Sequence, residues 1–224
     1  MIYSELKNID EILKIVKENE IFLILCNGCA EVCKVSDDKS VEEIESKLKE
    51  SGKDIKGKVK IDFLCSKILI ARKLKKFLNE ISSSKGLLVF SCGIGVQCVS
   101  DVIDKPVYPA TNTLYLGGFQ GLWPGKERCL ECGTCYLGIT GGICPIAFCT
   151  KQLVNGPCGG AKNGKCEIDK EKDCGWVLIY EKLKKINKLE ILKDYQEPRN
   201  YKLIEPDSKL RKKLFYDIDK NEEL

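Results

Sequence analysis

The sequence predicts an α/β protein: a three-layer N-terminal domain with a small, mainly parallel sheet, then an irregular cysteine-rich domain, a helix and an extended polar tail. Over residues 1–115, apolar runs of strand length alternate with helical apolar patterns. Residues 128–190 are rich in glycine and cysteine and show little apolar periodicity before their closing helix. Glycines and a proline mark a linker at 116–127, and a charged C-terminal arm occupies 191–224.

The elements of the first domain follow from the period of its apolar residues. They are, in order, a helix over 9–16, a strand over 21–25, a helix over 41–50, a strand over 59–63, a helix over 66–81, a strand over 86–90, a short helix over 96–103 and a strand over 107–108. Ser40 and Glu43 have the spacing of a capping box, and Leu78 falls among the inward residues of its helix. Strands that alternate with helices predict a parallel sheet with right-handed crossovers.

Cysteines follow the predicted strands of the first domain. Ligands collect at the carboxyl ends of parallel strands, so thiols at these positions are expected to converge. Five of them are candidate metal ligands: Cys26, Cys29, Cys33, Cys65 and Cys92. The alternative is a set of unrelated buried thiols, and this is the interpretation favoured for Cys98, which lies further into the next helix. Zinc or a third cluster would suit the site; the lack of two paired Cys-x2-Cys knuckles favours the cluster.

Eight further cysteines lie within 46 residues of the second domain. They are Cys129, Cys132, Cys135, Cys144, Cys149, Cys158, Cys166 and Cys174. Each four-iron cluster takes four thiolates, so this array predicts two 4Fe–4S clusters, with tetrathiolate zinc as the alternative. The chain contains no histidine, which excludes mixed Cys/His zinc fingers and any imidazole catalysis.

The order of these cysteines suggests how the two clusters share them. In bacterial ferredoxins the cysteine before a proline ligates the other cluster, and Cys144 precedes Pro145. By this analogy the first cluster takes Cys129, Cys132, Cys135 and a late cysteine, Cys174. The second then takes Cys144, Cys149, Cys158 and Cys166.

The cysteine content also bears on the compartment. Residues 1–20 show no signal-peptide pattern, and no apolar run reaches membrane-spanning length. A reducing cytoplasm is therefore predicted, where 14 cysteines in 224 residues are better explained by metal binding than by disulfides. Lys and Arg total 37 against 33 Asp and Glu, spread along the chain, so nucleic acid is not expected as a partner.

A competing motif runs from Cys92 to Cys98, where Cys-Gly-Ile-Gly-Val-Gln-Cys follows a strand and opens a helix. A dinucleotide fingerprint would have a third glycine at the position of Cys98, so the match is poor. No nucleophile, general base or phosphate cradle stands out elsewhere. The chain is therefore not expected to be catalytic by itself.

Several segments of the sequence, in the same order along the chain, are similar to those of a known family. They are Cys26–Cys33, Ser91–Gln97, Tyr108–Thr113, Arg128–Cys135, Leu137–Ala147, Leu153–Gly160, Gly164–Glu167 and Asp173–Trp176. Together they resemble the MetV-type iron-sulfur small subunit of anaerobic methylenetetrahydrofolate reductases.

The resemblance implies an electron-transfer subunit in one-carbon metabolism. In that family a separate barrel subunit binds FMN and folate and reduces methylenetetrahydrofolate to methyltetrahydrofolate. The small subunit would pass low-potential electrons to that FMN from ferredoxin or a similar donor. The alternative from the residues alone is a zinc-binding scaffold or maturation protein with no redox role.

Overall fold

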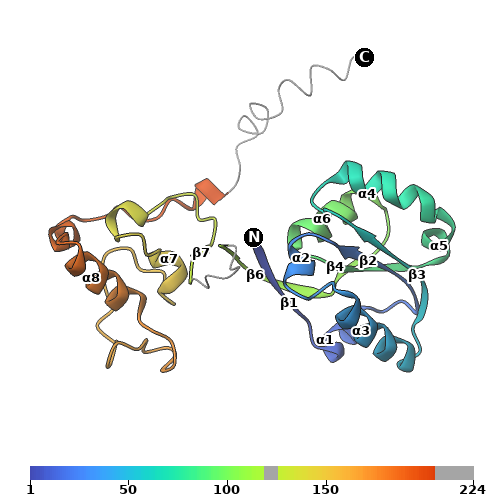
Figure 1. The fold of residues 1–224 in the computed structure, drawn as a ribbon, viewed down its shortest axis with the longest axis horizontal. Coiled ribbons are helices and arrows are strands. Elements are labelled where there is room, and N and C mark those ends of the chain that lie inside the picture. The colour runs from blue at the N-terminus through green and yellow to red at the C-terminus, as the bar shows by residue number, and fades with distance from the viewer. Residues whose placement is uncertain (119–125, 205–224) are drawn as a thin grey trace, which may run out of the picture. The chain divides into compact units, whose positions relative to one another are not determined.

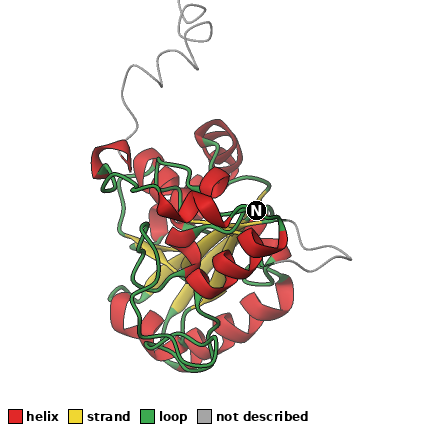
Figure 2. Cartoon of the chain, turned by 90° about the vertical axis from the view of Figure 1, so that its left-hand side faces the viewer, coloured by secondary structure: helices red, strands yellow, loops and turns green. Residues whose placement is uncertain are grey.

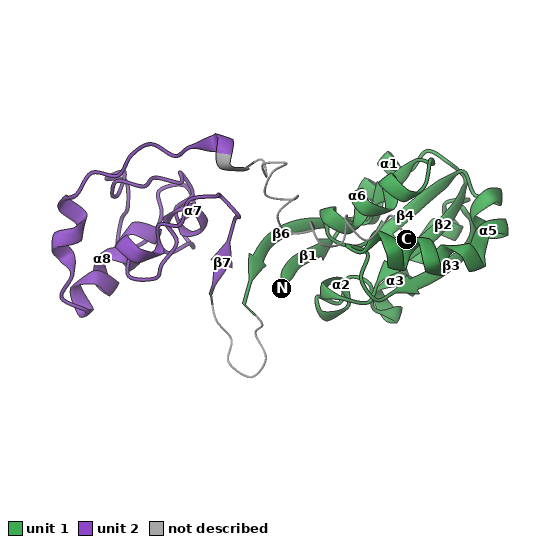
Figure 3. Ribbon diagram, turned by 90° about the horizontal axis from the view of Figure 1, so that it is seen from above, with its two compact units in different colours: residues 1–126 green, residues 127–224 purple. Residues whose placement is uncertain are grey.

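A computed structural model describes residues 1–118 and 126–204 of the chain (Figure 1). It divides into two compact units, residues 1–126 and 127–224, which Figure 3 shows in different colours. Most of the expected linker, and the part of the polar arm from residue 205 onward, lie outside the described residues. None of the described helices has both the length and the apolar character needed to cross a membrane.

A four-stranded parallel sheet forms the centre of unit 1. Its strands, in spatial order, are β3 (Asp54–Ile61), β2 (Glu20–Cys26), β4 (Gly86–Phe90) and β5 (Val107–Pro109). Every neighbouring pair is parallel, with Cys26 opposite Ile61 and Leu25 opposite Phe90. The predicted α/β class and the parallel sheet are confirmed.

Helices cover both faces of this sheet (Figures 1 and 2). They are α1 (Ile9–Ile15), α2 (Cys29–Val32), α3 (Asp38–Glu50), α4 (Lys67–Leu74), α5 (Leu78–Ser83) and α6 (Gly93–Val102). Phe22 and Ile24 of β2 pack in one core cluster with residues of α4, α5 and α6. Ile21 and Leu23 point to the opposite face and pack with α1 and α3. Successive residues of β2 therefore face opposite sides of the sheet, as in a strand that is buried on both faces. With helices on each side of the sheet, unit 1 has three layers.

A second pairing in unit 1 was not predicted. Strand β1 (Ile2–Leu6) runs antiparallel to β6 (Thr111–Gly117), with Ile2 opposite Leu116 and Leu6 opposite Thr111. The Tyr3 and Tyr115 rings stack at 4.7 Å between centroids. This pairing joins the two ends of the unit.

Two predicted details of the helices are wrong. Helix α3 begins at Asp38, so Ser40 lies inside it and donates its hydroxyl to the Lys34 carbonyl at 2.9 Å, which leaves no capping box. The single helix expected over 66–81 is broken by the 3-10 turn η1 (Lys75–Phe77) between α4 and α5. Beyond this break the Leu78 side chain turns outward and is 58% exposed.

Unit 2 has little regular structure. Its elements are β7 (Arg128–Cys129), η2 (Leu137–Ile139), α7 (Pro145–Phe148), α8 (Gly175–Lys185), η3 (Leu189–Lys193) and η4 (Tyr201–Ile204). The predicted closing helix is α8, which buries Trp176, Ile179 and Leu183. Together with Cys174 these form the buried cluster of the unit, against two much larger clusters in unit 1. A core this small predicts that unit 2 needs a further source of stability.

Candidate metal centres

The parallel sheet brings cysteines of unit 1 to its carboxyl edge. Cys26 is the last residue of β2, and Cys92 caps the amino end of α6 directly after β4. Cys65 lies in the short segment between β3 and α4. The predicted placement of these three cysteines beyond strand ends is therefore what the structure shows.

Electrostatic interaction links Cys65 to its neighbours. Burial raises the pKa of the Cys65 thiol above its usual value, and the nearby thiols of Cys26, Cys92 and Cys98 raise it further. Cys98 packs against the core cluster beneath α4 and α6, as the sequence predicts for it, and it is also near enough to act on the Cys65 thiol.

Cys29 and Cys33 lie at the two ends of the short helix α2, and Cys33 packs against the apolar cluster that also contains residues of α4 and α6. Cys29 opens α2, and Cys33 follows its last residue. Helix α2 contacts β1, and the Cys33 Sγ lies 3.6 Å from the Ile2 carbonyl oxygen of that strand.

Four cysteines of unit 2 line one small cavity. They are Cys149, Cys158, Cys166 and Cys174, and the other walls include Lys151, Pro157, Glu167 and Trp176. We name this feature the thiol cavity. Because thiolates bind soft metals and occur in fours at structural zinc and four-iron sites, this set has the chemistry of a metal centre.

Two local contacts bring the members of the thiol cavity together. A Cβ at Gly175 would come within 2.8 Å of the Cys149 nitrogen, so only glycine allows α8 to approach this backbone so closely. The Cys166 amide donates to the Lys172 carbonyl, and the Cys174 amide donates to the Gly164 carbonyl, each at 2.8 Å. These bonds fold 164–174 back on itself and carry Cys174 to the cavity.

This grouping differs from the one expected by analogy with ferredoxin. That analogy placed Cys174 with the early cysteines and Cys144 with Cys149, Cys158 and Cys166. The hairpin and the contact at Gly175 place Cys174 in the thiol cavity, which Cys144 does not line.

The remaining four cysteines of unit 2 are Cys129, Cys132, Cys135 and Cys144, which we name the early thiols. Cys129 lies on β7, and Cys144 caps the amino end of α7. Strand β7 contacts α7, so the first and the last of the four lie close together. Cys132 and Cys135 lie on the segment between them.

Hydrogen-bond donors face several of these sulfurs. The Glu131 amide donates to the Cys129 Sγ, and the Gly160 amide donates to the Cys158 Sγ, both at 3.4 Å. In each case the donor is two residues after the cysteine. Amide donors stabilise the thiolate form, which is the form that binds a metal.

Cys166 has donors from several residues. The Ile168 amide, the Thr150 hydroxyl and the Asp169 amide lower the pKa of its thiol below the usual value, in that order of effect, and the Lys172 charge adds to them. The Thr150 Oγ1 lies 3.6 Å from the Cys166 Sγ. Thr150 is thus a functional candidate that the cysteine pattern alone did not reveal.

Within the part of the chain that the structure describes, the cysteines form no disulfides, and their sulfurs are not arranged around a common centre. All fourteen cysteines lie in the described residues, and none forms a disulfide. Within residues 1–118 and 126–204, no three Cys, Asp or Glu side chains stand in metal-binding geometry. Side-chain rotation between staggered wells moves a sulfur substantially, so binding would require the thiols to turn inward. The donor set fits a thiophilic metal or a four-iron cluster.

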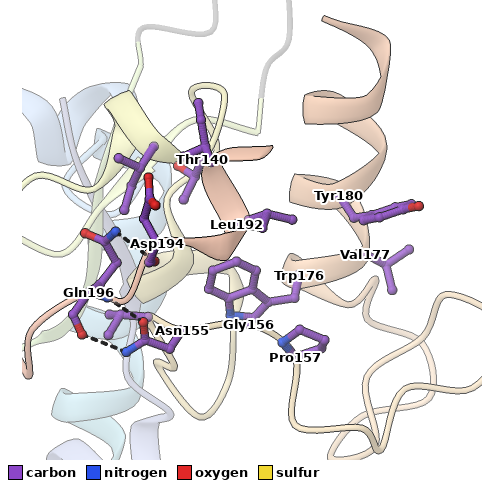
Figure 4. A pocket seen from close by; sticks show the side chains of 13 residues that line it. Thr140, Asn155, Gly156, Pro157, Trp176, Val177, Tyr180, Leu192, Asp194 and Gln196 are labelled. Atoms are coloured by element: carbon purple, nitrogen blue, oxygen red, sulfur yellow. Dashed lines mark hydrogen bonds between the residues drawn. The ribbon is translucent and has the colours of Figure 1, made fainter. Parts of the chain in front are cut away.

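Unit 2 also has an apolar pocket of about 330 Å³ (Figure 4). Pro157 and Trp176 line both this pocket and the thiol cavity. Asn155 and Gln196 are part of the pocket wall and are joined by two hydrogen bonds, of 2.8 and 2.7 Å. A molecule in this pocket would therefore share a wall with the four thiols.

The comparisons with known proteins concern the same region. A family model described as the C-terminal region of methylene-tetrahydrofolate reductase matches residues 108–202. Neither the curated proteins nor the solved structures gave a match. The matched residues include the thiol cavity and the early thiols, and they exclude every cysteine of unit 1. Over residues 108–202, which is less than half of the chain, the sequence is similar to the C-terminal region of methylene-tetrahydrofolate reductase.

Proposed function

We propose that this protein is an iron-sulfur electron-transfer subunit that passes low-potential electrons to the FMN of a partner flavoprotein, which reduces methylenetetrahydrofolate to methyltetrahydrofolate. The observation that carries the proposal is the coincidence of the family match with the eight-cysteine array. Four of those thiols line one cavity, and backbone amides donate to two of the eight sulfurs, those of Cys129 and Cys158. Such amide-to-sulfur bonds are characteristic of cluster ligation.

Each group of four thiols would hold one 4Fe–4S cluster. The thiol cavity supplies Cys149, Cys158, Cys166 and Cys174, and the early thiols supply the other set. When bound, such clusters carry single electrons at potentials that reach about −400 mV in ferredoxins. That range matches a ferredoxin or a similar low-potential donor.

The surrounding residues would hold the thiolates and set their charge. The amides two residues after Cys129 and Cys158 donate toward sulfur, and the Thr150 hydroxyl would donate to Cys166 in its thiolate form. Such donors favour the more negative, reduced state. Lys151 forms an ion pair with Glu167 in the wall of the cavity, and the nearby Cys158 helps to raise the pKa of Lys151. A positive charge beside a thiolate stabilises the more negative, reduced state, as the hydrogen-bond donors do.

The pocket beside the thiol cavity is the surface that we assign to the flavoprotein. Electron transfer needs a close approach, and Trp176 and Pro157 form a wall common to both spaces. Val177 and Tyr180 lie further along α8 in the same pocket, and Tyr180 is 45% exposed. An aromatic and aliphatic patch of this kind is typical of a partner contact.

The test is reduction of the flavin in a reconstituted pair. The anaerobically purified chain is mixed with an FMN-bearing methylenetetrahydrofolate reductase subunit and reduced ferredoxin, and FMN bleaching is followed. We expect rapid bleaching with the parent chain and with Cys33→Ser, and its loss with Cys166→Ser. FMN reduction at the same rate without this chain, or with a colourless zinc-loaded chain, would contradict electron transfer and leave a scaffold.

A further inference from the structure

Thiols lie on one face of the unit 1 sheet, at the carboxyl ends of its strands. Cys26 has the same orientation as Phe22 and Ile24, so it belongs to the core cluster beneath α4 and α6. Leu25 and Phe90 pair in register, and the next residue on each strand is Cys26 and Ser91. Cys92 then begins α6. Two cysteines from neighbouring strands thus approach the same helices.

Helix α6 carries Cys98 on the side that faces the Cys65 segment. A Cβ at Gly95 would lie 2.9 Å from the Leu64 Cβ, so this turn of α6 rests on the residue before Cys65. Two turns along, Asp101 forms an ion pair with Lys67. Because residues three apart are neighbours on a helix, Cys98 lies between these two contacts and next to the 64–67 segment.

A buried hydroxyl lies next to Cys92 at this edge of the sheet. The Ser91 hydroxyl, which a Cβ at Gly95 would strike, is buried without a hydrogen-bond partner in the part of the chain that the structure describes. A hydroxyl that lacks an acceptor is costly in a core, and a metal-bound thiolate would supply one.

Cys98 also has a route to solvent. It lines an open hollow of about 400 Å³ together with Lys67, Ile94, Gln97 and Asp101. A metal site needs such a path as well as its ligands. The hollow reaches Cys98, and Cys65 is itself exposed.

From this arrangement we infer that Cys26, Cys65, Cys92 and Cys98 form a four-thiolate centre for a thiophilic metal, with Cys29 and Cys33 outside it. Four thiolates suit either a single zinc ion or a four-iron cluster, and the same ligands serve both. The Cys33 sulfur is directed to the Ile2 carbonyl instead. The centre goes beyond the proposed electron transfer, which uses the cysteines of unit 2.

Serine variants of the full-length chain test the ligand set. Zinc, iron and acid-labile sulfide are measured per chain after anaerobic purification. We expect Cys98→Ser and Cys92→Ser each to lose one zinc, or about four irons with their sulfide, relative to the parent. Cys29→Ser and Cys33→Ser are the matched controls and should lose neither. Serine is a favourable residue at a helix amino cap, so Cys92→Ser should keep α6 intact.

The reverse pattern would overturn the inference: metal retained in Cys98→Ser and lost in the Cys29 and Cys33 variants. The clusters of unit 2 give an independent signal, because their iron and electron paramagnetic resonance should persist in every one of these variants. A failure of electron transfer and a failure of this centre are therefore distinguishable.

Alkylation of the unaltered chain avoids any folding defect of the variants. Iodoacetamide is applied before and after chelation, and peptides are mapped by mass spectrometry without reduction. We expect Cys65 and Cys98 to be protected with metal and to become reactive together on chelation, while the half-buried Cys29 reacts in both states. Disulfides among the four thiols, or reactivity of Cys65 and Cys98 that chelation does not change, would contradict a metal centre.

Discussion

Hydrogen-bond donors around the Cys166 sulfur favour its thiolate. Amide hydrogens of Ile168 and Asp169 and the Thr150 hydroxyl lower the pKa of this thiol, with a further contribution from Lys172. A lower pKa means that the proton is lost at a lower pH, so a larger fraction is thiolate near neutrality. Metal ligands must be deprotonated, and Cys166 is therefore well prepared for binding.

In the metal-free chain, Cys166 should be alkylated at a lower pH than an ordinary cysteine. Its rate of reaction with iodoacetamide should reach half its maximum below the usual pKa, because only the thiolate attacks. Thr150→Val removes one donor and should move this midpoint upward. The midpoints are read from peptide maps over a pH series, and an unchanged midpoint in Thr150→Val would show that the hydroxyl does not act on the sulfur.

Double serine variants test the grouping of thiols in unit 2, because the iron lost depends on whether the two cysteines belong to the same group. Cys149→Ser with Cys174→Ser would remove two ligands of one proposed cluster, so we expect it to lose about four irons, the same as either single variant. Cys149→Ser with Cys132→Ser touches both groups and should lose about eight. Iron analysis of the four chains checks this, and a loss of about eight irons from the first pair would contradict the grouping.

Sequence patterns predicted where cysteines of unit 1 lie relative to the strands, but not which cysteines of unit 2 line one cavity. Spacing and strand ends are local features, and they identified Cys26, Cys65 and Cys92 at the sheet edge. The position of Cys174 depends on a hairpin and on the close approach at Gly175, which no local pattern contains. The grouping of Cys98 with Cys65, which we propose, likewise depends on neighbours from a different segment.

At the scale of elements, the contact of α6 with the Cys65 segment depends on Gly95. A methyl group there would meet the Ser91 hydroxyl and the Leu64 Cβ. Gly93, on the same helix, has open space around it, with the Thr113 hydroxyl 3.6 Å from the added carbon. The two glycines thus form a matched pair.

Gly95→Ala should destabilise unit 1 by about 1–3 kcal/mol, because overpacking forces the helix away from Leu64. Gly93→Ala should have little effect or stabilise slightly, since alanine favours a helix. Urea denaturation followed by circular dichroism compares both with the parent. Equal stability of the two variants would show that α6 does not rest on Leu64 in solution.

The elements that the sequence missed have non-local causes. Strands β2 and β4 are continuous apolar runs, and periodicity is sufficient to predict them. Strand β1 is short and carries Glu5, and its partner is more than a hundred residues away, so its sheet arises from pairing and not from its own pattern. The break before Leu78 is likewise absent from the local pattern, because the apolar helical period of the sequence continues through it.

At the scale of the molecule, the two units are stabilised differently. Unit 1 has apolar clusters on both faces of its sheet, whereas unit 2 has the small cluster around Trp176 and many residues with positive φ. A unit with a small core needs constraints such as metal ligation to remain folded.

Chelation should therefore affect the two units unequally. After removal of iron, we expect amide hydrogen exchange to accelerate throughout 127–204, while strands β2 and β4 remain protected by their apolar core. Mass spectrometry of peptides from both units, before and after chelation, measures this. Unchanged protection in 127–204 would mean that unit 2 folds without metal.

The composition of the whole chain was sufficient to predict two regions of different character. Composition does not identify which metal would bind, because zinc and iron-sulfur sites use the same thiolates.

The most direct measurement of the central claim is iron, acid-labile sulfide and zinc per full-length chain after strictly anaerobic purification. Two four-iron clusters in unit 2 predict about eight irons and eight sulfides, and about twelve of each if the unit 1 centre is also a cluster. Zinc without iron would contradict electron transfer by this protein and would make the cysteine-rich unit a zinc-stabilised scaffold.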